Sequence, residues 1–144
     1  MLTNRKNGPF FNISTVGHLN VGKSSLFNSL SYKRISIVHD VAGVMRDVIT
    51  HEIRDGIVIM DTGGYGLSGS TNIKEIINNV DDQVCRAIVS ADLIFFVVDA
   101  RDGVMPMDYD IAEMLHKSGN DVIVIANKID GERNEQFADV FKIF

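Results

Sequence analysis

The sequence predicts an α/β fold in which a mostly parallel sheet is covered by helices on both faces. Two observations predict it. Continuous apolar runs, typical of strands that are buried on both faces, alternate along the chain with amphipathic stretches of helix length. The pair Asp55-Gly56, a strong hairpin signal, interrupts this alternation. We therefore expect one antiparallel strand, at the edge of the sheet.

The first half of the chain predicts strands around a single short helix. The expected elements are a buried strand over 10–16, a helix over 24–30, and a hairpin of strands over 48–53 and 57–60. Residues 31–44 show no clean hydrophobic period, and we expect a mobile connection there.

The second half predicts helices that alternate with buried strands. Residues 72–90 place apolar side chains at helical spacing along one face. The remaining expected elements are a strand over 93–98, a helix over 107–117, a strand over 122–126 and a helix from Glu132 onward.

The length indicates a single domain. At 144 residues the chain fits one domain, and no strand follows the last expected helix. We therefore expect a tail over 1–9 and a domain over 10–144 that is C-terminally truncated and lacks its last strand and helix.

Charge, hydropathy and cysteine content exclude several function classes. The net charge of −5 argues against direct nucleic-acid binding, which needs clustered Lys and Arg. No apolar run approaches the ~18 residues of a membrane span, and the polar N-terminus lacks the apolar core of a signal peptide. Cys85 is the only cysteine, which suits a reducing compartment. We expect a cytoplasmic protein that binds no membrane.

A phosphate-binding motif lies between the first expected strand and the first expected helix. The segment Gly17-His18-Leu19-Asn20-Val21-Gly22-Lys23-Ser24 matches G-x-x-x-x-G-K-[ST], the P-loop pattern. Its glycines let backbone N–H groups wrap phosphates, and the helix N-terminus adds its positive dipole end. We expect Lys23 to reach the β- and γ-phosphates and the Ser24 hydroxyl to hold Mg²⁺. A plain glycine-rich turn is the alternative, which the strand–helix context disfavours.

A second motif, Asp61-Thr62-Gly63-Gly64, directly follows the strand expected over 57–60. A carboxylate there can hold Mg²⁺ through water, across the site from Ser24. The Gly64 N–H can sense the γ-phosphate, because no side chain blocks the approach. Alone, such a segment is usually a turn, but the upstream P-loop pattern favours a nucleotide contact.

A third motif, Asn127-Lys128-Ile129-Asp130, follows the strand expected over 122–126 and predicts specificity for guanine. The Asp130 carboxylate can accept both the N1–H and the 2-amino group of guanine, a donor pair that adenine lacks. The Asn127 side chain can brace the loop, and the Lys128 stem can lie along the base. An ATP-using P-loop protein, such as a kinase, conflicts with this motif. The sequence therefore predicts a P-loop NTPase that binds GTP.

Other polar positions have simpler interpretations. Asp108 is expected to be the N-cap of the helix over 107–117. The segment Asp99-Ala100-Arg101-Asp102 follows a strand and is expected to brace a loop. The histidines show no metal-binding spacing.

Together the motifs resemble GTPases related to bacterial translation factors, and most closely the first GTPase domain of the Der (EngA) family. The likeness rests on Asn20–Asn28, Gly43–Asp47, Asp61–Gly64, Val97–Arg101 and Asn127–Asp130. It implies a three-layer, Ras-like G domain that hydrolyses GTP to GDP and phosphate slowly, as a conformational switch. Such a parent protein works in assembly of the large (50S) ribosomal subunit. Era-like and tRNA-modifying GTPases are the alternative relatives.

The resemblance also implies roles for individual residues. The implied catalytic residues are Lys23, Asn20 and Gly64. Asn20 stands where related GTPases coordinate a K⁺ that acts in place of an arginine finger, so K⁺-stimulated hydrolysis is expected. Tyr65 stands where Ras-like GTPases carry a water-positioning Gln. The remaining implied nucleotide contacts are Gly17, His18, Leu19, Val21, Gly22, Ser24, Ser25, Asp61, Thr62, Gly63, Tyr65, Asn127, Lys128 and Asp130.

The chain departs from the family pattern in its loops. His18 and Leu19 stand where the family has Arg and Pro. Met45 stands where the family has a Thr that binds Mg²⁺ in the GTP state, and a Met side chain supplies no hard oxygen ligand. Thr50 could substitute only if the loop shifted register. The alternative function is therefore a nucleotide-binding module with little or no hydrolysis.

Overall fold

The computed structural model describes residues 8–18, 20–30, 36–38, 49–61 and 73–129. The elements in chain order are β1 (Phe11–Val16), α1 (Lys23–Leu30), β2 (Ser36–Val38), β3 (Ile49–Arg54), β4 (Ile57–Asp61), α2 (Ile73–Ser90), β5 (Leu93–Asp99), α3 (Pro106–Ser118) and β6 (Asp121–Asn127). The predicted α/β class is confirmed. Residues 1–7 of the expected tail and the helix expected from Glu132 lie outside the described residues.

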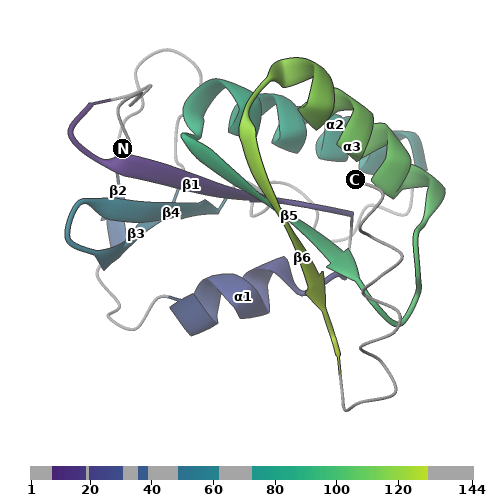
Figure 1. Cartoon of the computed structure of the whole chain (residues 1–144), viewed down its shortest axis with the longest axis horizontal. Coiled ribbons are helices and arrows are strands. Elements are labelled where there is room, and N and C mark those ends of the chain that lie inside the picture. The colour runs from purple at the N-terminus through teal and green to yellow at the C-terminus, as the bar shows by residue number, and fades with distance from the viewer. Residues whose placement is uncertain (1–7, 19, 31–35, 39–48, 62–72, 130–144) are drawn as a thin grey trace.

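The strands form one mixed sheet in the order β2-β3-β4-β1-β5-β6 (Figure 1). Strand β1 pairs in parallel with β4 and β5, and β5 pairs in parallel with β6. Strand β3 is antiparallel to both of its neighbours, which confirms the predicted antiparallel strand on this side of the sheet. The short strand β2 pairs with β3 on the side away from β4. It lies within residues 31–44, where we expected a mobile connection. Three residues are too few to show an alternating pattern, so β2 had no local signal.

The hairpin between β3 and β4 follows the turn that the sequence predicted. Arg54 and Ile57 pair across it, and Gly56 has a φ of 74°, a value that favours glycine in tight turns. The Gly56 N–H donates to Glu52 Oε1 at 3.0 Å. The turn fixes the register of β3 against β4. On its other side β4 pairs with β1, where Ser14 lies opposite Met60.

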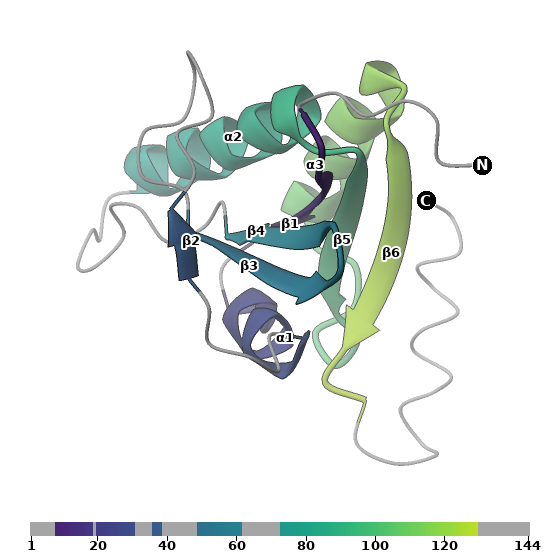
Figure 2. The ribbon, with the colours of Figure 1, turned by 90° about the vertical axis from the view of Figure 1, so that its left-hand side faces the viewer.

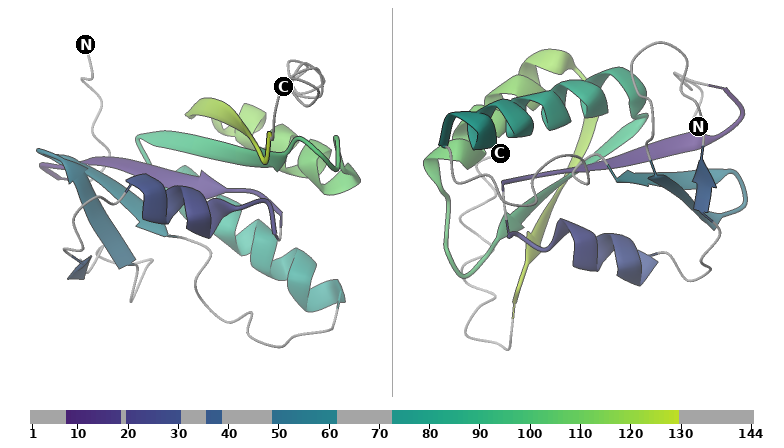
Figure 3. Two further views of the ribbon diagram at one scale, coloured as in Figure 1. Left: turned by 90° about the horizontal axis from the view of Figure 1, so that it is seen from below. Right: turned by 180° about the vertical axis from the view of Figure 1, so that it is seen from behind.

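Helices cover both faces of the sheet, as predicted. Figure 2 and Figure 3 show α1 on one face and α2 with α3 on the other. On the α1 face, Ile13, Phe27 and Ile59 form a small buried cluster. The larger cluster lies under α2 and α3 and includes Val16 and Phe96. Side chains alternate along β1, so this strand contributes Ile13 to one cluster and Val16 to the other. The end of β1 is therefore held by packing on both faces of the sheet.

The start of α3 corrects one detail of the prediction. Met105, rather than Asp108, is the N-cap, and Pro106 occupies the first helical turn. Asp108 stands three residues beyond the cap, where its Oδ2 accepts the Met105 N–H at 2.8 Å. The carboxylate therefore satisfies a free donor at the helix start from inside the helix. None of the helices within the described residues is long and apolar enough to span a membrane.

Candidate functional site

The loop between β1 and α1 depends on glycine at two of its positions. Gly22 has a φ of 93°, and a Cβ there would lie 2.1 Å from Asn127 Nδ2. A Cβ on Gly17 would lie 2.3 Å from the backbone oxygen of Val97. The motif glycines are thus required by close packing against β5 and the end of β6. Leu19 lies outside the described residues.

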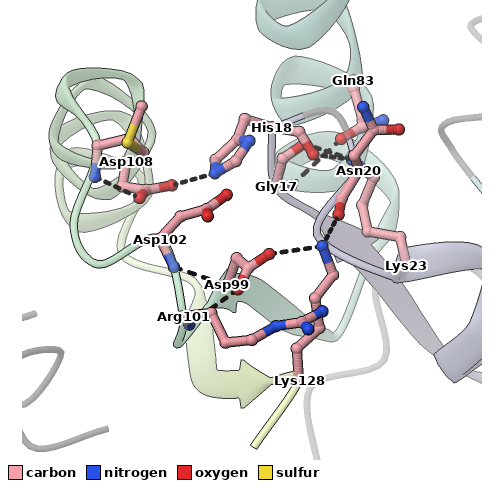
Figure 4. Close-up of polar contacts among 11 residues, drawn as sticks. Gly17, His18, Asn20, Lys23, Gln83, Asp99, Arg101, Asp102, Asp108 and Lys128 are labelled. Carbon is pink, nitrogen blue, oxygen red and sulfur yellow. Dashed lines mark hydrogen bonds and ion pairs between the residues drawn. The ribbon is translucent and has the colours of Figure 1, made fainter. Parts of the chain in front are cut away.

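Lys23 lies over the start of this loop. Its Nζ donates to the backbone oxygens of Gly17 at 2.5 Å and His18 at 2.8 Å (Figure 4). Val21 is buried, whereas Asn20, Ser24 and Ser25 are exposed. The Lys23 ammonium group therefore lies against the backbone of the loop, while the hydroxyl groups of Ser24 and Ser25 at the start of α1 are accessible to solvent.

The third motif contacts the loop directly. Asn127 Nδ2 donates to the Val21 oxygen at 2.9 Å, so the brace predicted for this side chain is present. Lys128 Nζ donates to the Asn20 backbone oxygen and to Asp99 Oδ2 (Figure 4). Asn20 and Lys128 both have left-handed backbone conformations, with φ of 63° and 62°. Two motifs more than a hundred residues apart are thereby joined by hydrogen bonds.

Asp99 is the buried counter-charge at this junction. It is 2% exposed, and besides Lys128 it accepts the backbone N–H groups of Arg101 at 2.9 Å and Asp102 at 3.4 Å. Burial raises the pKa of the Asp99 carboxyl, but these hydrogen bonds outweigh it and hold the pKa below its usual value. The loop brace expected at this segment is present, and its link to the motif lysine was not predicted. A carboxylate at the end of β5, beside the end of β6, was the available signal.

His18 lies close to the start of α3. Its Nε2 is 3.7 Å from Oδ1 of Asp108, which is fully buried. Burial raises the pKa of the Asp108 carboxyl, while the Met105 N–H and the nearby His18 act in the opposite direction. No local pattern connects Asp108 with the loop, because the contact spans ninety residues.

The second motif begins at the same edge of the sheet. Asp61 is the last residue of β4, directly beyond the pairing of Met60 with Ser14 of the parallel strand β1. The backbone therefore places Asp61 beside the end of β1, where the loop starts. Thr62, Gly63, Gly64, Tyr65, Met45 and Asp130 lie outside the described residues.

These residues fit a Mg²⁺ ion that is bound together with a nucleotide. The exposed Ser24 hydroxyl at the start of α1 and a carboxylate at the end of β4 are the oxygen ligands that Mg²⁺ prefers. Within the described ranges, no group of three or more His, Cys, Asp or Glu could hold a metal ion. A site completed by phosphate oxygens and water needs no such group. Thr50 is buried in β3 and paired with Met60, so it does not lie in a loop where it could replace a ligand.

A family model described as 50S ribosome-binding GTPase matches residues 12–128. The chain belongs to this GTPase family. The GTPase Der of Caldanaerobacter subterraneus subsp. tengcongensis is 44% identical to this chain over 137 residues, which cover 91% of the chain and 30% of the relative. The GTPase Der of Akkermansia muciniphila is 44% identical over 126 residues, covering 85% and 26%. The resemblance to Der is confirmed, and the chain spans 30% and 26% of the length of these two relatives.

Solved structures share the fold of this chain. Aquifex aeolicus Era bound to GDP and AlF4⁻ matches with a TM-score of 0.61 at 26% identity, over 92% of the chain and 45% of Era. A probable GTP-binding protein, EngB, matches with a TM-score of 0.63 at 23% identity, over 92% of the chain and 79% of that protein. The EngB match, at this identity, concerns the fold alone. The predicted G-domain fold is confirmed.

Proposed function

We propose that this chain binds GTP and GDP with Mg²⁺ and hydrolyses GTP to GDP and phosphate as a conformational switch. The observation that carries the proposal is the pair of hydrogen bonds from Asn127 and Lys128 to the loop at Val21 and Asn20. A guanine-recognising segment and a phosphate-binding loop that hold each other would enclose the two ends of one nucleotide.

The phosphates would be bound by the backbone N–H groups of residues 17–25 and by the start of α1. On binding, the Lys23 ammonium would exchange its bonds with Gly17 and His18 for phosphate oxygens. Ser24 and Asp61 would hold Mg²⁺, which neutralises charge on the phosphates. The Gly64 N–H would then contact the γ-phosphate, and release of that phosphate would free the segment that follows Asp61. No protein nucleophile is needed, because water attacks in line.

Base specificity would come from the third motif. Asp130 would accept the two guanine donors, while the side chains of Asn127 and Lys128 anchor the start of the same segment. Titration with a fluorescent GDP analogue, followed by competition, tests this: GTP should displace the analogue and ATP should not. Equal displacement by ATP would reject guanine specificity.

We further propose that K⁺ stimulates hydrolysis through Asn20. This residue is exposed and has a left-handed backbone held by the bond from Lys128. Multiple-turnover phosphate release in KCl and in NaCl at equal ionic strength measures the effect. Faster release in KCl is expected, and equal rates would remove K⁺ from the proposal.

In its full-length parent the domain would act in the cytoplasm on the large ribosomal subunit. Family membership and the Der relatives support this, and the net charge of −5 favours contacts made by other parts of the parent. Co-sedimentation of the full-length parent with purified 50S subunits, with GTP or GDP present, is the test. Binding that ignores the nucleotide would argue against a switch.

A second candidate function is a nucleotide-binding module with little hydrolysis. It is favoured by Met45, since Thr50 is buried in β3 and does not replace the missing oxygen ligand. Single-turnover phosphate release by the wild type and by Met45→Thr separates the two functions. A wild type without turnover, together with an active Met45→Thr, would favour the module.

A further inference from the structure

Helix α2 contacts the phosphate-binding loop through a buried glutamine. Gln83 is 6% exposed, and its Oε1 accepts the Gly17 N–H at 3.3 Å (Figure 4). Its neighbours on the helix, Val84 and Ala87, belong to the large core cluster. A buried amide is costly unless it is hydrogen-bonded, so this contact has structural significance beyond packing.

The contact holds the first residue of the loop at a position where the backbone has no freedom to adjust. A Cβ on Gly17 would lie 2.3 Å from the Val97 oxygen, so β5 packs closely on one side. The Gly17 oxygen accepts Lys23 Nζ, whereas its N–H is bound by Gln83. Lys23 is also the cation that phosphates attract. If Lys23 exchanges its bond with the Gly17 oxygen for a phosphate, the hydrogen bond from the Gly17 N–H to Gln83 would still hold this residue in place.

We infer that Gln83 is a positioning residue of the phosphate-binding loop and that its bond to Gly17 couples the loop to α2. The inference rests on the proposed nucleotide binding. It gives α2 a role that none of the three motifs covers. The helix also follows, along the chain, the segment that begins with Asp61-Thr62-Gly63-Gly64. Nucleotide occupancy and the position of α2 would therefore influence one another reciprocally.

The test compares Gln83→Met with wild type. Methionine is close to glutamine in size and fills the same buried space, but it offers no oxygen acceptor to Gly17. We expect Gln83→Met to release a fluorescent GDP analogue about fivefold faster, the change that follows loss of a hydrogen bond of ordinary net strength. A role in packing alone predicts unchanged release, because the core remains filled. Asp82→Asn, an exposed neighbour on the same helix, is the matched control and should release at the wild-type rate.

Amide hydrogen exchange supplies a second readout, beginning with the wild type alone. In the nucleotide-free wild type, the Gly17 amide should exchange slowly. In Gln83→Met it should exchange faster, while the Val97 amide in β5 is unchanged. An unprotected Gly17 amide in the folded wild type would overturn the inference, as would equal release by Gln83→Met. Failure of the wild type to bind the GDP analogue would instead reject the proposed function.

Discussion

Asn127 Nδ2 lies 2.1 Å from the point that a Cβ on Gly22 would occupy, and it donates to the Val21 oxygen at 2.9 Å. The Asn127 side chain at the end of β6 therefore packs so closely against Gly22 that there is room for a hydrogen atom on the Gly22 Cα but not for a Cβ. This contact joins the loop expected to bind phosphate and the segment expected to bind the base. A change on either side of it should therefore be felt on the other.

Gly22→Ala should disable both motifs at once. The new methyl group would clash with Asn127, and the φ of 93° is unfavourable for any residue with a Cβ. We expect affinity for GDP to fall by at least about tenfold, which corresponds to roughly 1.4 kcal/mol. Gly103→Ala is the control, because Gly103 has a φ of 71° and a Cβ there would meet no heavy atom within 4 Å. It should lose some stability and keep its GDP affinity. Equal losses of affinity in both variants would contradict the clash.

Asp99→Asn should lower stability in a pH-dependent manner. The folded-state pKa of Asp99 lies below its usual value, so the charged form contributes stability above the unfolded-state pKa of about 3.9. That contribution is lost as the pH falls through the folded-state pKa. At pH ~7 we expect the free energy of unfolding to drop by about 1–3 kcal/mol, since a buried charged hydrogen bond is weakened. Denaturant titrations across the acid range should show this difference shrinking below pH ~4.

Glu113→Gln serves as the comparison for that series. Glu113 pairs with Lys117 at 2.6 Å on the exposed face of α3, and this pair lowers the pKa of the Glu113 carboxyl. Water screens such a pair, so the substitution should leave the unfolding midpoint unchanged. A larger loss for Glu113→Gln than for Asp99→Asn would show that burial is not the deciding factor.

Asp108→Asn should raise stability at neutral pH. Burial raises the folded-state pKa of Asp108, so its charged form costs stability once the pH exceeds the unfolded-state value. The asparagine oxygen can still accept the Met105 N–H, and the charge disappears. Thermal unfolding at neutral pH and at pH ~4 should show an advantage of the variant that narrows on acidification. A variant less stable than wild type at neutral pH would mean that the contact with His18 outweighs the cost of burial.

Lys23→Met should strongly weaken nucleotide binding without unfolding the chain. The ammonium group donates to backbone oxygens of its own loop, which are neutral acceptors that water can also satisfy. Charge-assisted bonds to phosphate are stronger, and we expect affinity for GDP to fall by about a hundredfold. Calorimetric titration measures the affinity, and circular dichroism checks the fold. Lys117→Met, on the exposed face of α3, should bind GDP like wild type.

Much of the fold could be predicted because its elements have strong local signals. Strands β1, β4, β5 and β6 lie within two residues of the expected ranges, because their apolar side chains are concentrated in short runs. The expected burial of β6 is not found: it is the last strand in the sheet order, and all of its residues are half-buried or exposed. Strand β2 was not predicted, because it is only three residues long and is defined by its pairing with β3 rather than by a local sequence pattern. The sequence predicted Asp108 as the N-cap of α3, but the N-cap is Met105. A sequence does not distinguish a capping carboxylate at the N-cap from one inside the first turn that accepts the N-cap N–H.

The sequence motifs of the candidate site could be predicted, whereas the contacts that other elements make with them could not. Spacing predicted the loop from Gly17 to Ser24 and the segment from Asn127 as nucleotide contacts, because each motif is contiguous in the sequence, and these roles stay predictions. The partners Gln83, Asp99 and Asp108 touch the motifs from other elements, at separations that no local pattern encodes. The placement of Asp99 follows from the order of the parallel strands, which brings the ends of β1, β5 and β6 together. Gln83 and Asp108 are brought to the loop by the packing of α2 and α3.

Calorimetric titration of the folded chain with GDP and Mg²⁺, repeated with ADP, tests the central claim most directly. Saturable binding of GDP to a single site, with no measurable heat from ADP, is the result that a guanine nucleotide site formed by these joined loops predicts. A folded sample that gives no heat with GDP, or equal heats with both nucleotides, would contradict it.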